Sequence, residues 1–325
     1  MEDLGIVLSG GGVKGVGHIG FLQALKEHNI VPKYISGTSA GALVGALYCA
    51  GYGTKEMLRF FKKTPLISWY YYSTSKPGLL DTEKYRVHFE KYFPETTFES
   101  LQTQLFILTT DIEQGCSVIH HKGDLVEPLM ASCSVPLVFS PVKINDTLHS
   151  DGGIMNNFPV EPLSDLGLPG ILGSYVCSPM PIAPKELSTS LKVMFRAFDL
   201  SQEALSLHKF DRCDYVIAPK ELHKIGFLDS KGIDEAYQIG YEATLSSIDR
   251  IIDTLALDPE LRPVRSMPQP AYCTRGVEKE EVSEKPVKTT EKTKSNNYFS
   301  YFDVWPLNWA FGKQESEKAS HTEQQ

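Results

Sequence analysis

The chain has no excess of positive charge. Its 325 residues include 32 Lys and Arg against 40 Asp and Glu, which gives a formal net charge of −8. Proteins that bind nucleic acid present a basic face to the phosphate backbone. We therefore expect no nucleic-acid partner.

Long apolar runs are also missing. No run approaches the roughly 18–20 residues that a membrane-spanning helix requires. The first residues, Met1-Glu2-Asp3-Leu4, lack the basic and apolar regions of a signal peptide. We therefore expect a cytoplasmic protein, and leave peripheral contact with a membrane open.

The spacing of the cysteines excludes two further kinds of site. Six Cys are scattered through the chain without a CxxC pair. Zinc sites and disulfide frameworks show recurrent short spacings. We expect reduced thiols that serve as small core residues, and neither a metal nor another cofactor.

Strand and helix patterns alternate from the N-terminus. Leu4–Leu8 is a short apolar run typical of a strand that is covered on both faces. This alternation predicts an α/β fold, a three-layer sandwich with a mainly parallel central sheet. Helices are expected over about 16–27 and 42–50, and further strands over 33–36, 105–109, 142–144, 170–176 and 215–217.

The composition changes near residue 266. Residues 276–297 are nearly all charged or polar and cannot bury a core. We therefore predict a folded domain over residues 1–265, a charged, disordered linker over 266–297, and an aromatic segment with a polar tail over 298–325.

The aromatic segment offers a possible membrane contact. Aromatic rings such as those of Trp and Tyr suit the headgroup boundary of a bilayer. Packing of the segment against the folded domain is an equal alternative. The candidates for peripheral contact are Tyr298, Phe299, Trp305 and Trp309.

The first of two glycine motifs suggests a nucleotide site. Gly10 to Gly15 fits the pattern G-x-G-x-x-G between a strand and a helix. A dinucleotide site also needs an acid on the next strand, about 20 residues on. That strand ends Ile35-Ser36-Gly37 without one, and Val16 replaces the lysine of a Walker loop. A nucleotide-binding protein is therefore the alternative hypothesis.

The second motif favours a nucleophilic serine. In Gly37-x-Ser39-x-Gly41, the serine would lie at a sharp strand-to-helix turn, where flanking glycines avoid collisions. The dipole of the following helix would favour negative charge there. Gly10 to Gly12 could expose the backbone N–H groups of an oxyanion hole. The simpler alternative is a tight turn with an N-cap serine.

A nucleophilic serine needs a base. The chain order of an α/β-hydrolase would make His208 or His223 the candidate, but neither lies in a motif. Asp151 is followed by Gly152 and Gly153, which leave room for approach to Ser39. A carboxylate can take the proton if the oxyanion is stabilised. A hairpin turn is the alternative explanation of Asp-Gly-Gly.

These motifs together resemble the patatin-like phospholipase family. The resemblance covers about residues 4–265. Its blocks, in the order of the family, are Gly10 to Gly15, Gly37 to Gly41, Ala131 to Pro136, Phe139-x-Pro141-Val142, Asp151 to Gly153 and Asn157-x-Pro159.

The resemblance implies a lipid acyl hydrolase of the phospholipase A or lysophospholipase type. It would cleave the carboxylic ester of a phospholipid or other acyl-lipid through an acyl-enzyme on Ser39, with Asp151 as base. A non-catalytic lipid-binding module of the same fold is an alternative. The implied oxyanion hole is Gly10, Gly11 and Gly12, and the implied supporting residues are Lys14, Gly15, Gly37, Gly41, Gly152 and Gly153.

Two points about the site stay open at this stage. Lys14 could stabilise charge near the site or form an ion pair that holds the glycine loop. The aromatic run over residues 66–72, followed by Leu79 and Leu80, could form one wall of an acyl-chain entrance or a buried strand.

Overall fold

The computed structural model describes residues 3–64 and 69–256, so the predicted linker and aromatic segment lie outside the described residues. The predicted strands are present, and two further strands, β4 and β6, are added. The strands are β1 (Leu4–Leu8), β2 (Tyr34–Thr38), β3 (Gln104–Asp111), β4 (Cys116–His120), β5 (Val142–Ile144), β6 (Thr147–Asp151), β7 (Gly170–Ser174) and β8 (Tyr215–Ile217).

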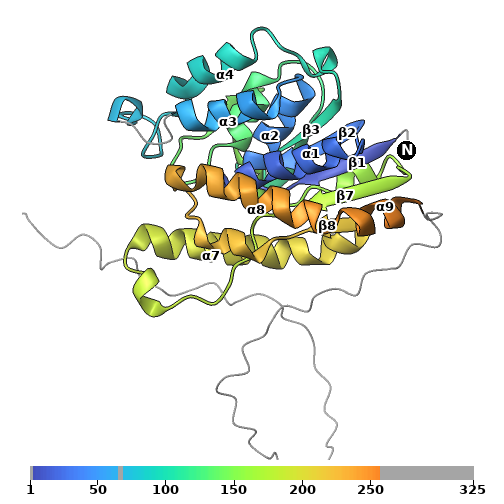
Figure 1. The fold of residues 1–325 in the computed structure, drawn as a ribbon. Helices are drawn as coiled ribbons and strands as arrows, with labels where there is room; N and C mark the ends of the chain where they lie inside the picture. Colours follow the sequence, from blue (N-terminus) through green and yellow to red (C-terminus); the bar gives the residue numbers. More distant parts are fainter. Residues whose placement is uncertain (1–2, 65–68, 257–325) are drawn as a thin grey trace, which may run out of the picture. The chain divides into compact units, whose positions relative to one another are not determined.

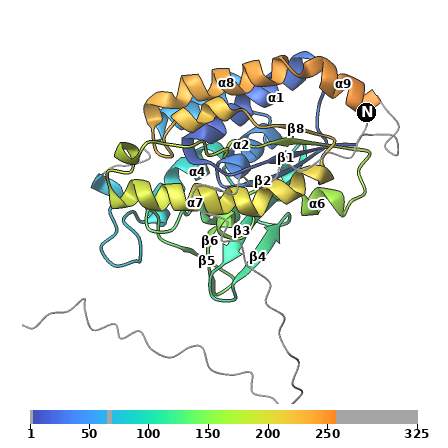
Figure 2. The same ribbon diagram turned by 90° about the horizontal axis from the view of Figure 1, so that it is seen from below.

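Helices lie on both sides of one sheet (Figures 1 and 2). Helices α1 and α8 lie on one side, and α6 and α7 on the other. The α-helices are α1 (Gly17–Glu27), α2 (Ala40–Cys49), α3 (Thr54–Lys63), α4 (Arg86–Tyr92), α5 (Val126–Ser132), α6 (Glu161–Ser164), α7 (Ser190–Ser206), α8 (Ile233–Leu245) and α9 (Ile248–Ala256).

The sheet is parallel through its centre and antiparallel at one end. Its connected order is β5-β6-β3-β2-β1-β7-β8, with β4 also paired to β3. The pairs β3–β2, β2–β1, β1–β7 and β7–β8 are parallel. The pairs that involve β4, β5 and β6 are antiparallel. The predicted α/β sandwich is therefore confirmed, with a mixed sheet.

Strand β1 is buried on both faces, as its apolar run predicts. Ile6 and Leu8 belong to the larger core, and Val7 between them belongs to the other. Alternate side chains of a strand point to opposite faces of the sheet. The two cores therefore lie on opposite faces, which gives three layers.

The register of β3 brings the ends of β2 and β6 together. Strand β2 pairs with residues 104–108 of β3, and β6 pairs with residues 109–111. Strand β4 pairs with residues 107–111 and so overlaps both stretches. Because a strand has only two edges, β2 and β6 must follow one another along the same edge. Ser39, which follows β2, is thereby placed beside Asp151, which ends β6.

Two observations bear on membranes and thiols. Within residues 3–64 and 69–256, no helix is both long and apolar enough to cross a bilayer. The five cysteines in the same part of the chain are free, and Cys49, Cys177 and Cys213 are buried as expected of small core residues.

Candidate active site

Ser39 lies in a strained turn between β2 and α2. It has φ 53° and ψ −123°, a conformation that residues with a side chain rarely adopt. The turn is held in place because the Ser39 N–H donates to Ser132 Oγ at 2.9 Å, and that hydroxyl donates to the Leu108 carbonyl at 2.7 Å. Strain at a position fixed from outside is typical of a functional site.

The glycines around Ser39 are required by backbone contacts. A Cβ at Gly41 would lie 2.3 Å from the Leu8 carbonyl oxygen, and one at Gly37 would lie 2.7 Å from the Gly41 backbone. A Cβ at Gly15 would lie 2.4 Å from Ala40 Cβ. The helix that carries the serine therefore packs directly on the glycine loop and on β1.

Asp151 is a buried carboxyl at the end of β6. Its Oδ1 accepts the Gly153 N–H at 2.7 Å, while Oδ2 is buried and has no hydrogen-bond partner among the described residues. Burial raises the pKa of Asp151 to about 7, against the lowering effect of the Ser39 hydroxyl and the Gly153 N–H. The carboxyl is thus poised to exchange a proton near neutral pH.

One short segment, residues 131–136, supports both groups. Its Ser132 holds the Ser39 amide, and its Ser134 carbonyl accepts the Asp151 N–H at 3.0 Å. The Ser150 hydroxyl donates to the same carbonyl at 2.5 Å. The segment therefore fixes the serine and the carboxyl relative to one another.

The loop Gly10 to Gly12 approaches the serine closely. A Cβ at Gly10 would lie 3.1 Å from Ser39 Cβ, and the Gly10 N–H donates to the Asn157 carbonyl at 3.2 Å. Within the described residues, no hydrogen bond occupies the N–H of Gly11 or Gly12. Gly12 has φ 59°, and a Cβ there would lie 2.3 Å from the Phe227 carbonyl oxygen.

Lys14 forms an ion pair behind this loop. Its Nζ lies 2.8 Å from Asp199 Oδ2 on α7, and the lysine side chain is 6% exposed. Burial opposes the charge, but Cys177 and Asp199 outweigh it and raise the pKa of Lys14 overall. Of the two roles left open by the sequence, the geometry favours the ion pair that holds the loop.

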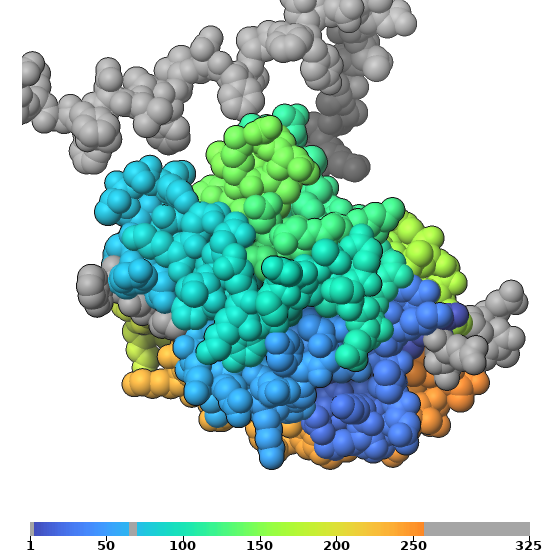
Figure 3. All heavy atoms as spheres, turned by 90° about the horizontal axis from the view of Figure 1, so that it is seen from above, coloured from blue at the N-terminus to red at the C-terminus, as the bar shows by residue number. Residues whose placement is uncertain are grey.

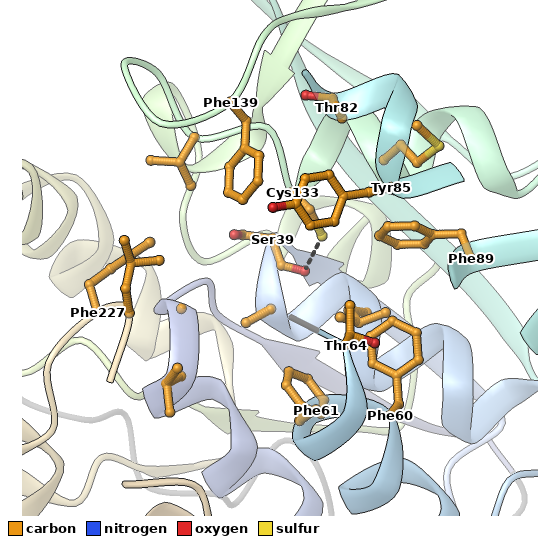
Figure 4. A pocket seen from close by; sticks show the side chains of 17 residues that line it. Ser39, Phe60, Phe61, Thr64, Thr82, Tyr85, Phe89, Cys133, Phe139 and Phe227 are labelled. Atoms are coloured by element: carbon orange, nitrogen blue, oxygen red, sulfur yellow. Dashed lines mark hydrogen bonds between the residues drawn. The ribbon is translucent and has the colours of Figure 1, made fainter. Parts of the chain in front are cut away.

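An apolar pocket opens beside Ser39. Figure 4 shows Tyr85 and Phe139 on one side of the serine and Phe60 and Phe61 on the other. The lining comes from α2, α3, α4, the 3₁₀ turn before α4, the segment after α5 and two short loop stretches. The remaining lining residues are Gly12, Val13, Ala40, Leu43, Thr64, Thr82, Phe89, Met130, Cys133, Val135, Phe227 and Leu228.

The predicted aromatic wall is formed in part. Residues 65–68 lie outside the described residues, and Trp69–Tyr71 is a short 3₁₀ helix, so the buried-strand alternative is wrong there. The Tyr71 ring lies 4.2 Å from the ring of Tyr85, which lines the pocket. The segment therefore backs the pocket wall without forming its surface.

No described histidine is hydrogen bonded to Ser39. His208 and His223 are both exposed, and His223 contacts the Lys220 carbonyl. His18 is fully buried between Ser174 and the Ser9 carbonyl, and burial lowers its pKa to about 4. The carboxyl of Asp151, and neither His208, His223 nor His18, therefore lies beside the serine hydroxyl.

Sequence reasoning missed Ser132 and the pocket helices. Ser132 lies in a segment that the resemblance includes, but its sequence gives no sign that the hydroxyl holds Ser39. Phe60 and Phe61 are far from the motifs, and only the packing of α3 brings them to the site. Within residues 3–64 and 69–256, no cluster of His, Cys, Asp and Glu could hold a metal ion.

The α/β fold, the strained serine and its carboxyl neighbour together define a candidate serine esterase site. The family model of patatin-like phospholipases matches residues 6–164. That region of the chain belongs to the patatin-like phospholipase family, which confirms the resemblance carried by the motifs.

The alignments with individual relatives include a larger share of this chain than of the relative. An uncharacterized NTE family protein of Mycobacterium tuberculosis is 28% identical over 279 residues, 76% of this chain and 46% of that protein. Lysophospholipase NTE1 of Cryptococcus neoformans is 28% identical over 239 residues, 69% of this chain and 15% of that protein. The chain thus spans less than half the length of these relatives. VipD from Legionella pneumophila superposes with a TM-score of 0.46 at 15% identity, covering 77% of this chain and 67% of VipD.

Proposed function

We propose that this chain hydrolyses a carboxylic ester of a lipid through an acyl-enzyme on Ser39. The observation that carries the proposal is the position of Ser39, which borders an apolar pocket and has a buried carboxyl of raised pKa beside it. The family membership of residues 6–164 supports a lipid ester as substrate.

In the first half-reaction, Ser39 Oγ attacks the ester carbonyl carbon as Asp151 takes the hydroxyl proton. The oxygen that becomes negative would be stabilised by the free N–H groups of Gly11 and Gly12 and by the N-terminus of α2. The bond to the leaving alcohol then breaks, and Asp151 returns the proton to the alcohol oxygen. The acyl group remains on Ser39.

In the second half-reaction, water replaces the serine as nucleophile. Asp151 takes a proton from water while the hydroxide oxygen attacks the acyl carbon. The bond to Ser39 Oγ breaks, and Asp151 gives that oxygen its proton. Asp151 returns every proton that it takes, so the proposed cycle balances without a histidine.

The pocket accounts for the lipid part of the substrate. Its aromatic and aliphatic lining would hold an acyl chain with its ester at Ser39, as apolar pockets with few polar groups do. Since a relative is named a lysophospholipase, a single-chain phospholipid is the first substrate to test. The aromatic residues of 298–311 are proposed as a peripheral membrane contact, independent of the chemistry.

Hydrolysis of lysophosphatidylcholine by the full chain, followed as fatty-acid release, tests the proposal. Wild type should release fatty acid with a chelator present, and Ser39→Ala should lose all but a trace. Ser246→Ala, a change at an exposed serine, should be unaffected. Lipid binding without turnover would instead support the non-catalytic module, and nucleotide binding without turnover would support the nucleotide site.

A further inference from the structure

Four large apolar side chains are exposed on one part of the surface. Tyr70 is 64% exposed, Tyr72 and Leu79 are each 50% exposed, and Leu137 is 52% exposed. We call these four residues the apolar patch. Exposed apolar residues that occur singly need no explanation, whereas a contiguous group indicates a binding surface.

Backbone pairing makes the patch contiguous. The Leu79 N–H donates to the Leu137 carbonyl at 3.0 Å, and Tyr72 forms a β-bridge with Leu80. The neighbours Tyr71 and Leu80 are buried, so the chain alternates between inward and outward side chains. The segments are coloured cyan and green on the face seen in Figure 3.

The patch lies on the outer side of the pocket wall. Leu137 stands between Val135 and Phe139, both of which line the pocket. Tyr71, between the two patch tyrosines, packs on Tyr85 of the same lining. A surface that meets the patch is therefore next to the pocket that borders Ser39.

The backbone at Leu137 is strained although its side chain is half exposed. Leu137 has φ 70°, a region that Asn and Gly tolerate better than Leu. Because the side chain is half exposed, it gains little from burial in this structure. Retaining an apolar side chain there makes sense if it is buried against a partner.

The two lysines beside the patch are already engaged in contacts within the chain. Lys76 is paired with Asp81 at 2.9 Å, and Lys84 donates to the carbonyl oxygens of Tyr70 and Tyr72. The whole chain carries −8 and would be repelled by an anionic surface. The partner that fits the patch is therefore a surface without net charge and with an apolar interior.

We propose that the apolar patch inserts into a zwitterionic lipid surface and so places the pocket mouth against it. The inference rests on the proposed function, because lipid substrates would enter the pocket from that surface. Tyrosine rings suit the headgroup boundary, and the two leucines would reach the acyl region.

Vesicle sedimentation with phosphatidylcholine vesicles tests the patch in the full chain. The triple variant Tyr70→Ser/Leu79→Ser/Leu137→Asn should partition at least about tenfold less than wild type, because apolar area is lost. Wild-type binding should change little between low and high salt. Ile252→Ser, which removes a 42% exposed side chain from α9, should bind as wild type does.

Leu137→Asn alone separates binding from folding. Asn relieves the backbone strain, so the melting temperature should stay equal or rise while partitioning falls. Ser39→Ala should still bind vesicles, since this proposal concerns docking and not chemistry. Unchanged vesicle binding by the triple variant would overturn the patch. The patch would also be overturned if vesicle binding disappeared only when the chain ends at Asn297. A loss of soluble-ester turnover by the triple variant equal to its loss of vesicle binding would overturn it as well.

Discussion

Asp151 is an ionisable carboxyl that is buried, and burial disfavours its charged form. It is only 1% exposed, and its Oδ2 has no hydrogen-bond partner among the described residues. Burying a carboxylate with so little support destabilises the fold. The same burial raises the pKa of Asp151 to about 7, which suits the proposed role of the group as a base.

The burial of Asp151 predicts a pH-dependent stability. Between pH 3.8 and about 7, the folded chain keeps a proton that the unfolded chain has lost. The free energy of unfolding therefore falls as pH rises through this window, and Asp151→Asn removes that loss. The variant should gain up to about 4 kcal/mol at pH 8 relative to its effect near pH 4. Chemical denaturation at both pH values measures this gain.

Activity should move in the opposite direction. Only the ionised carboxyl can accept a proton, so kcat/KM of wild type should rise through about pH 7 and then level off. Asp151→Asn should lose nearly all activity while gaining stability. A variant that is both less stable at pH 8 and still active would show that Asp151 is structural.

The backbone strain at Ser39 can be measured by comparing the stability of two variants that both lack the hydroxyl. Glycine adopts φ 53° and ψ −123° readily, whereas alanine keeps the strain of serine. Ser39→Gly should therefore be more stable than Ser39→Ala, by about 1–3 kcal/mol. Thermal unfolding of the two proteins checks the difference, and an equal or lower stability of the glycine variant would mean that the turn is relaxed.

At the scale of elements, α7 is tied to the glycine loop by one buried ion pair. The side chains of Lys14 and Asp199 are 6% and 18% exposed. Removing either partner therefore leaves an unpaired charge that is largely shielded from water. We expect this contact to help position the loop that carries the Gly11 and Gly12 amides.

If the ion pair stabilises the fold, each single variant should lose stability and the double variant should regain it. Lys14→Met and Asp199→Leu should each cost about 3–5 kcal/mol, and the combined variant should recover most of this loss. Activity should follow the recovery in part, because Lys14 does not touch the reacting atoms. A stable Lys14→Met protein without activity would instead give the lysine a direct role in charge stabilisation.

The sequence predicts the elements better than their pairing. The apolar run of β1 and the glycines around Ser39 carry strong local signals, and both are confirmed in place. Strand β6 was missed because Thr147–Asp151 is mostly polar. Its register against β3, which sets Asp151 beside Ser39, is a long-range property that no local pattern contains.

On the scale of the whole molecule, the site is assembled from parts remote in sequence. The proposed nucleophile, Ser39, follows β2, the proposed base, Asp151, ends β6, and α3 and α4 contribute to the pocket. Most of the site therefore comes from residues that are far from Ser39 in the sequence. Because the chain spans less than half the length of relatives such as the M. tuberculosis protein, activity has to be established on this chain itself.

Covalent labelling with a fluorophosphonate tests the central claim most directly, because phosphonylation requires an activated serine hydroxyl. Intact mass and peptide mapping of the full chain should show one adduct, on Ser39, formed faster as pH rises through about 7. The adduct should be absent from Ser39→Ala and form far more slowly on Asp151→Asn. An unlabelled wild type, an adduct on another residue, or equal labelling of Asp151→Asn would contradict the account.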